Sequence, residues 1–240
     1  MYYGYGYGYG IDPWYILVMI AFIFSMVAQT KVSGTFNKYS RVGNKKGLTG
    51  AQVATQMLQG AGIYDVSVQR VAGNLTDHYD PRTKTLRLSQ GVYDSTSVAA
   101  LGVAAHETGH AIQHDVGYAP LGLRSMLVPL ANFGSRMAMP LILIGFLFSA
   151  SMGFGGSTLI TLGILFFSLS VAFTLITLPV EFNASRRAIR ILAEDGYLGA
   201  EEIGGAKKVL SAAAMTYVAA AFAAVAQLLR LVAIFGRRND

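Results

Sequence analysis

The feature that most constrains the fold is the stretch from Met137 to Val180, which holds no Asp, Glu, Lys or Arg over 44 positions. A helix needs about 20 mostly apolar residues to cross a bilayer, so this stretch is long enough for two crossings. The glycine-rich sequence from Met152 to Gly156 predicts a tight turn between them. With 53% hydrophobic and 13% charged residues, the chain is also too apolar for an ordinary soluble domain. We therefore predict a membrane protein with a transmembrane hairpin at residues 137–180.

Two further apolar segments lie near the ends of the chain. Residues 11–30 predict an N-terminal transmembrane anchor with its N-terminus outside, because basic residues follow the apolar run and the positive-inside rule puts them in the cytoplasm. A cleaved signal peptide is disfavoured, since its basic residues would precede the apolar run. Residues 209–236 predict a C-terminal helix that is either transmembrane or interfacial, because it carries Gln227 and Arg230. Residues 1–10 are a Tyr-Gly repeat that predicts either a disordered tail or tyrosines resting at the membrane interface. The basic residues after the anchor are Lys31, Lys38, Arg41, Lys45 and Lys46.

The two water-facing parts of the chain are residues 31–136 and residues 181–208. The hairpin between them crosses the membrane twice, so both parts lie on the same side. In the first part, Thr49 and Gln52 form a capping-box pattern at the start of a helix. The sequence Asp80–Thr83 predicts a turn, and the segments around it alternate or read as extended chain. The predicted strands are Asp65–Val71, Leu75–Tyr79 and Thr85–Leu88.

One helix of this region carries the sequence HExxH. Residues 97–114 read as an uninterrupted helix, on which His106 and His110 share one face. Two imidazoles at that spacing can bind one Zn²⁺, and Glu107 beside them can take a proton from a water that the metal activates. The small residues Thr108 and Gly109 are expected to leave room for a substrate. The alternative is a helix with two incidental histidines. The predicted fold class is an α-helical membrane protein with a small α+β zincin-like catalytic unit and about four membrane-associated helices.

A catalytic zinc usually has three protein ligands, so the motif lacks one. The metzincin spacing fails, because Val116 stands where that spacing needs a third histidine. His114 lies about 6 Å farther along the helix axis than His110, and it is interpreted as a supporting or surface residue. Glu181 is the best candidate, because it is the first charged residue after the uncharged stretch and lies at the membrane exit. The alternative is a glutamate that only caps the cytoplasmic end of a span.

The anchor, the HExxH unit, the apolar hairpin and the helix that begins at Glu181 together resemble the bacterial YugP-like family of neutral zinc metallopeptidases. They resemble the HtpX-type gluzincin membrane proteases more distantly. In those relatives the third ligand is the Glu of a Glu-x-x-Ala-Asp motif, which maps onto Glu181 with Ala184 matching. Ser185 stands where the relatives have Asp, which removes a carboxylate that would orient a ligating histidine. The resemblance implies a multi-pass protein of the bacterial cytoplasmic membrane, with residues 181–208 carrying the third ligand. The charge pattern predicts that this ligand lies on the cytoplasmic side.

The predicted activity is hydrolysis of peptide bonds by a zinc metalloendopeptidase. Zn²⁺ would be bound by His106, His110 and Glu181, with Glu107 as general base. His78, or its neighbour Tyr79, is expected to help stabilise the oxyanion, although His78 fits a surface strand position equally well. The strand Thr85–Leu88 is expected to offer its edge to an extended substrate. The rival hypothesis is a non-catalytic zinc-binding membrane scaffold or adaptor, in which Glu107 would be dispensable.

The expected partners are protein or peptide substrates, membrane proteins among them, and the lipid bilayer; an oligomer is compatible with the sequence. Nucleic acid is not expected, because the basic residues cluster beside apolar segments instead of alternating with exposed aromatic residues. A transporter is set aside, because the polar residues within 137–180 are only Ser and Thr. The chain has no cysteine, which excludes disulfides and thiolate metal ligands.

Overall fold

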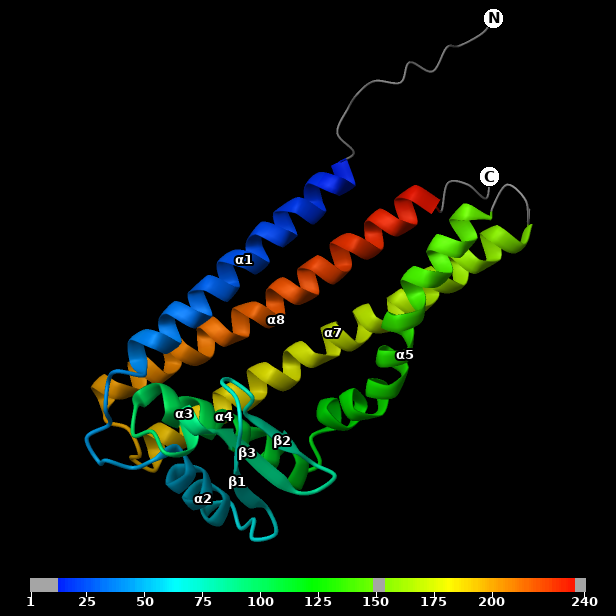
Figure 1. Cartoon of the computed structure of the whole chain (residues 1–240). Helices are drawn as coiled ribbons and strands as arrows, with labels where there is room; N and C mark the ends of the chain where they lie inside the picture. The colour runs from blue at the N-terminus through cyan, green and yellow to red at the C-terminus, as the bar shows by residue number, and fades with distance from the viewer. Residues whose placement is uncertain (1–12, 149–153, 236–240) are drawn as a thin grey trace, which may run out of the picture.

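The computed structural model describes residues 13–148 and 154–235, in which four long helices extend from a small α+β unit (Figure 1). Each of the four is long and apolar enough to cross a membrane. The arrangement confirms the predicted fold class. The four helices are α1 (Pro13–Tyr39), α5 (Ala119–Leu147), α7 (Phe154–Glu194) and α8 (Ala200–Phe235).

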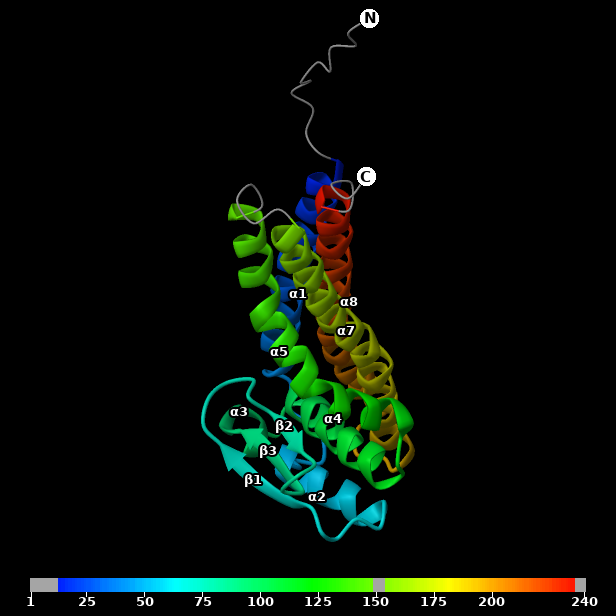
Figure 2. The same cartoon turned by 90° about the vertical axis from the view of Figure 1, so that its right-hand side faces the viewer.

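The long helices pack mainly as two pairs, α1 with α8 and α5 with α7 (Figures 1 and 2). The aromatic rings of Phe24 and Phe222 meet edge to face between α1 and α8, with centroids 6.4 Å apart. Arg230, one of the residues that left the nature of the last helix open, lies with its guanidinium 5.3 Å from the centre of the Tyr15 ring. The α8 helix therefore runs along the bundle beside α1, and its arginine is accommodated there.

Glycines allow the α5 and α7 helices to approach closely. A Cβ atom added to Gly134 would lie 2.6 Å from the carbonyl oxygen of Phe166, and one added to Gly163 would lie 2.8 Å from that of Ala138. Small residues at such contacts let two backbones pack tightly inside a membrane, where van der Waals contact drives helix association. The pair of helices is thus held together over much of its length.

The helices extend beyond the boundaries that the sequence predicts. The α1 helix continues through Lys31 to Tyr39, α5 crosses the boundary at residues 136/137, and α7 runs past Val180 to Glu194. The α8 helix begins at Ala200, ahead of the predicted residue 209. The apolar run marks only the part suited to lipid, whereas the hydrogen bonds of a helix continue into the charged sequence that follows. The Tyr-Gly repeat and the tail after Phe235 lie outside the described residues. Of the predicted turn from Met152 to Gly156, the first two residues also lie outside them, whereas Phe154–Gly156 belong to α7, so the prediction of a turn at these three residues is wrong.

The α+β unit contains two short helices, three strands and the HExxH helix. The predicted capping box is confirmed, because Gln52 N donates to Thr49 Oγ1 at 3.2 Å and Thr49 N donates to Gln52 Oε1 at 2.9 Å. The predicted turn at residues 80–83 is confirmed as well, with Asp80 accepting hydrogen bonds from Arg82 N and Thr83 Oγ1. The elements are α2 (Gly50–Gly60), β1 (Ser67–Val71), β2 (His78–Asp80), β3 (Thr85–Ser89), α3 (Gln90–Tyr93) and α4 (Val98–Asp115).

The strand order is β1-β3-β2, with β1 parallel and β2 antiparallel to β3. The prediction that Thr85–Leu88 offers a free edge is therefore wrong, because this strand lies in the centre with both edges paired. Its burial agrees, since Leu86 and Leu88 are fully buried. The second strand begins at His78 instead of Leu75, whose positive φ of 56° interrupts the extended chain.

The α4 helix lies between the sheet and the ends of α7 and α8 (Figure 2). On one side, Ala100 and Ala104 pack in a core with the strand residue Leu86. On the other side, Leu101 packs in a second core with Leu192 of α7. The alanine-rich sequence suits this position, because small side chains let a helix be enclosed on two faces. The HExxH helix is thus fixed relative to α7.

Candidate metal centre

Three side chains from two helices converge at one point. His106 and His110 lie one turn apart on α4, and Glu181 lies on α7. Glu181 Oε2 is 3.2 Å from His106 Nε2 and 3.5 Å from His110 Nε2. Ligand atoms placed tetrahedrally around zinc, each at 2.0–2.1 Å from it, are about 3.3 Å apart. The three groups are nearly enclosed, with side-chain exposures of 12%, 11% and 3%, and their spacing fits a single ion.

Hydrogen bonds behind His110 determine which of its nitrogens faces the carboxylate. Gln113 Nε2 donates to the Val180 carbonyl at 2.8 Å, which turns Gln113 Oε1 toward His110 Nδ1 at 3.0 Å. An amide oxygen can only accept, so this network assigns the proton of His110 to Nδ1. His110 Nε2 then presents a lone pair to Glu181. Two acceptors at 3.5 Å require a positive charge between them, as a metal ion or a proton would supply.

The electrostatic surroundings of His110 also favour positive charge. Burial alone would lower the pKa of His110, but its interaction with Glu181 and the charge of Glu107 raise that pKa overall. This donor set of two imidazoles and one carboxylate is the one that Zn²⁺ prefers in hydrolytic sites.

Ser185 takes the place of the carboxylate that the related motif would supply. Its Oγ lies 3.1 Å from His106 Nδ1, one helical turn after Glu181. Both histidines are therefore held from behind, His110 by Gln113 and His106 by Ser185. Such outer partners fix the orientation of a ligating ring and its tautomer.

We expect Ser185→Ala to lower zinc affinity by about 10-fold, the lower end for loss of a partner behind a metal ligand. The ring of His106 would lose the contact that orients it. Competition between the protein and a chromogenic zinc chelator measures the affinity. Ser185→Asp should keep or raise the affinity, because a carboxylate accepts from Nδ1–H more strongly than a hydroxyl. Equal affinities for wild type and Ser185→Ala would contradict the orienting role.

The small residues between the two histidines serve helix packing. A Cβ atom on Gly109 would lie 2.8 Å from the carbonyl oxygen of Ala184, so α4 and α7 touch at this glycine. Thr108 is fully buried and donates from Oγ1 to the Ala104 carbonyl at 2.8 Å. The expectation that these residues leave room for a substrate is wrong. Their size instead brings Glu181 within reach of the histidines.

Glu107 and two residues from other helices lie around the three ligands. Glu107 is partly exposed on α4, and its charge acts on His110 and on Tyr217 of α8. Arg124 of α5 places Nη1 3.8 Å from Glu181 Oε1. A base is thus available beside the ligands, and side chains from α5 and α8 line the same site.

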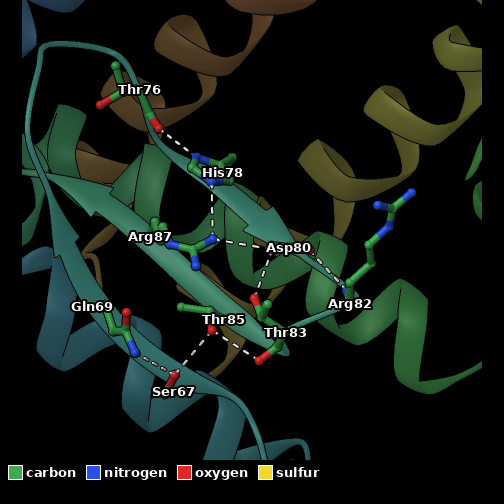
Figure 3. Close-up of polar contacts among 9 residues, drawn as sticks. All are labelled: Ser67, Gln69, Thr76, His78, Asp80, Arg82, Thr83, Thr85 and Arg87. Carbon is green, nitrogen blue, oxygen red and sulfur yellow. Dashed lines mark hydrogen bonds and ion pairs between the residues drawn. The ribbon is translucent and has the colours of Figure 1, made fainter. Parts of the chain in front are cut away.

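The predicted helper residues, His78 and Tyr79, lie on β2 at the edge of the sheet, and Figure 3 shows the surroundings of His78. His78 Nδ1 is 2.8 Å from the Thr76 carbonyl oxygen, and His78 Nε2 is 3.5 Å from Arg87 Nη1. The Tyr79 hydroxyl is 2.8 Å from His114 Nδ1. Burial and nearby carboxylates raise the pKa of Tyr79 to about 12, so its hydroxyl stays protonated. These contacts join β2 to the neighbouring strand and to α4, and the catalytic role of His78 stays a prediction.

Two histidines and a glutamate arranged around one point, with a second glutamate beside them, define a site of the zinc hydrolase class. The chain belongs to the family described as "Putative neutral zinc metallopeptidase", which matches residues 14–236. It is 49% identical over 224 residues to "Putative membrane protease YugP" of Bacillus subtilis (strain 168), a match that covers 93% of this chain and 97% of the relative. No solved structure matches the chain significantly.

Proposed function

We propose that this protein is a membrane-embedded zinc metalloendopeptidase of the gluzincin type. The observation that carries the proposal is the position of Glu181 Oε2, 3.2 Å from His106 Nε2 and 3.5 Å from His110 Nε2, with Glu107 next to His106 on α4. Membership in a metallopeptidase family and likeness to a relative named as a membrane protease support it. The substrates are protein or peptide chains that reach the end of the helix bundle where the α+β unit lies.

In the proposed hydrolysis, the zinc ion and the side chains around it have different roles. Zn²⁺ held by the three ligands would lower the pKa of a water molecule and polarise the scissile carbonyl. Glu107 takes the proton of the attacking water on its carboxylate and delivers it to the departing amine nitrogen. Gln113 and Ser185 hold the two imidazoles in place. The partial exposure of Glu107 allows it to meet both water and substrate.

We expect Glu107→Gln to retain zinc and to lose peptide cleavage by about 10²- to 10⁴-fold, because the amide keeps the shape of the side chain but cannot accept the proton. Metal analysis of the detergent-purified protein and cleavage of casein measure the two effects. Asp115→Asn, which removes an exposed carboxylate from the same helix, should leave both unchanged. If Glu107→Gln cleaved as well as the wild type, a scaffold function with a structural zinc would replace the proposal.

The catalytic end of the molecule is proposed to face the cytoplasm. Basic residues gather at this end, on the last turns of α1, on α7 after Glu181 and at the start of α8, as the positive-inside rule requires. The chain has no cysteine, so single cysteines can be introduced without background. We expect Lys45→Cys in intact cells to resist an impermeant maleimide until the membrane is opened. Labelling of intact cells would place this end outside.

A further inference from the structure

Arg124 enters the metal centre from a helix that supplies none of the ligands. It lies in the second turn of α5, and its Nη1 is 3.8 Å from Glu181 Oε1. That separation exceeds the 2.7–3.2 Å of an N–H···O hydrogen bond, so the guanidinium is near the carboxylate without being bonded to it. The other carboxylate oxygen, Oε2, is the one that faces the histidines. Arg124 therefore lies beside the oxygen of Glu181 that faces away from the histidines.

One hydrogen-bond donor of Arg124 has no partner in the part of the chain that the structure describes. This donor is the buried Nε. A buried donor without a partner costs about 1–3 kcal/mol, so its retention calls for an explanation. The side chain as a whole is 31% exposed, which leaves it reachable from outside. These features suit a group whose partner arrives with the substrate.

The neighbourhood fits an oxygen that becomes negative. Tyr217 of α8 interacts electrostatically with Arg124, Glu181 and Glu107, so a hydroxyl group lies near the guanidinium and the two carboxylates. Peptide hydrolysis develops negative charge on the scissile carbonyl oxygen, and preorganised donors there lower the barrier. A guanidinium presents several N–H groups in a fixed plane and remains charged at any working pH.

We propose that Arg124 is a catalytic residue that binds the carbonyl oxygen of the scissile peptide bond and stabilises the charge that develops on it. The inference rests on the proposed peptidase function. The competing role is structural, in which Arg124 only holds Glu181 in position. The two roles differ in measurable ways, because a positioning role affects zinc binding whereas an oxyanion role affects the transition state and its analogues.

The test compares wild type, Arg124→Gln, Arg124→Lys and the control Arg136→Gln, which removes an exposed arginine from the same helix. Zinc affinity is measured first. Calorimetry then gives the affinity for phosphoramidon, whose tetrahedral phosphoryl anion resembles the transition state, and for acetohydroxamate, which chelates zinc without such a centre. We expect Arg124→Gln to keep zinc and acetohydroxamate affinity, and to lose about 10²- to 10³-fold both in phosphoramidon affinity and in kcat for casein. Arg124→Lys should fall between, and Arg136→Gln should match the wild type.

Weakened zinc binding in Arg124→Gln would overturn the proposal in favour of a positioning role. Equal phosphoramidon affinity in wild type and Arg124→Gln, including absence of binding by both, would also overturn it. The binding measurements need no turnover. A wild type that binds phosphoramidon through Arg124 but cleaves nothing would therefore contradict the peptidase function, and with it the catalytic role of Arg124, while showing that Arg124 binds an anion at the metal centre.

Discussion

Glu181→Gln should abolish stoichiometric zinc binding by the purified protein. The amide has nearly the same shape as the carboxylate, but it is neutral and binds zinc far more weakly. Loss of an outer partner costs about 10- to 100-fold in metal affinity, so loss of a ligand should exceed about 100-fold. The substitution also removes the negative charge that faces His106 and His110 at 3.2 and 3.5 Å. Zinc per chain after dialysis against a weak chelator is the measurement, and casein cleavage should be lost with the metal.

The control for this substitution lies on the same helix. Glu194 is exposed and pairs with Arg190 at 3.9 Å near the end of α7, so Glu194→Gln changes the same chemical group far from the ligands. It should retain one zinc per chain and full cleavage. Full zinc occupancy in Glu181→Gln would show that the third ligand is another residue.

Gly109→Ala should damage the metal centre without touching a ligand. The added methyl group would stand 2.8 Å from the carbonyl oxygen of Ala184 and 3.2 Å from its Cα, and backbone cannot yield as a flexible side chain does. Overpacking typically costs about 1–3 kcal/mol, which exceeds the gain of about 1 kcal/mol that alanine offers over glycine inside a helix. Relief of the clash requires α4 and α7 to separate, which draws Glu181 away from the histidines. We expect lower zinc affinity and a smaller rise in melting temperature on adding zinc.

Gly204→Ala provides the matched control, because Gly204 lies inside α8 and a Cβ atom added there would meet nothing within 4 Å. Here the helix propensity gain is unopposed, so the melting temperature should stay the same or rise and the zinc response should persist. If both alanine variants kept the wild-type zinc response, close approach of α4 and α7 would not be what positions Glu181.

Patterns within one helix allowed much of the site to be predicted. The spacing of His106 and His110 is a property of a single helix, and the position of Glu181 after an uncharged stretch singled it out. Gln113 was open to the same reasoning, since it lies three residues after His110 on the same face. Arg124 and Tyr217 carry no such signal, because only the packing of α5 and α8 brings them to the metal centre.

Hydrophobic patterns predicted which segments form helices and strands, but they did not predict which of these elements lie side by side. Apolar runs identified four helices but marked only their lipid-facing parts, so the charged extensions of α1, α7 and α8 were read as separate segments. Alternation identified Thr85–Leu88 as a strand. Alternation does not say which strands flank it, and the pairing of β1 on one edge and β2 on the other makes this strand central.

The metal centre joins parts of the chain made at different times. His110 and Glu181 are 71 positions apart (181 − 110), and α5 with the apolar part of α7 lies between them. At a synthesis rate of roughly 5–20 residues per second, a nascent chain carries two ligands for about 4–14 s before the third is made. In the proposed topology, Glu181 can reach the histidines only after the intervening hairpin has left the ribosome and returned to the same side of the bilayer. Peptide hydrolysis would thus require completed membrane insertion, and a truncated or misinserted chain would be inactive.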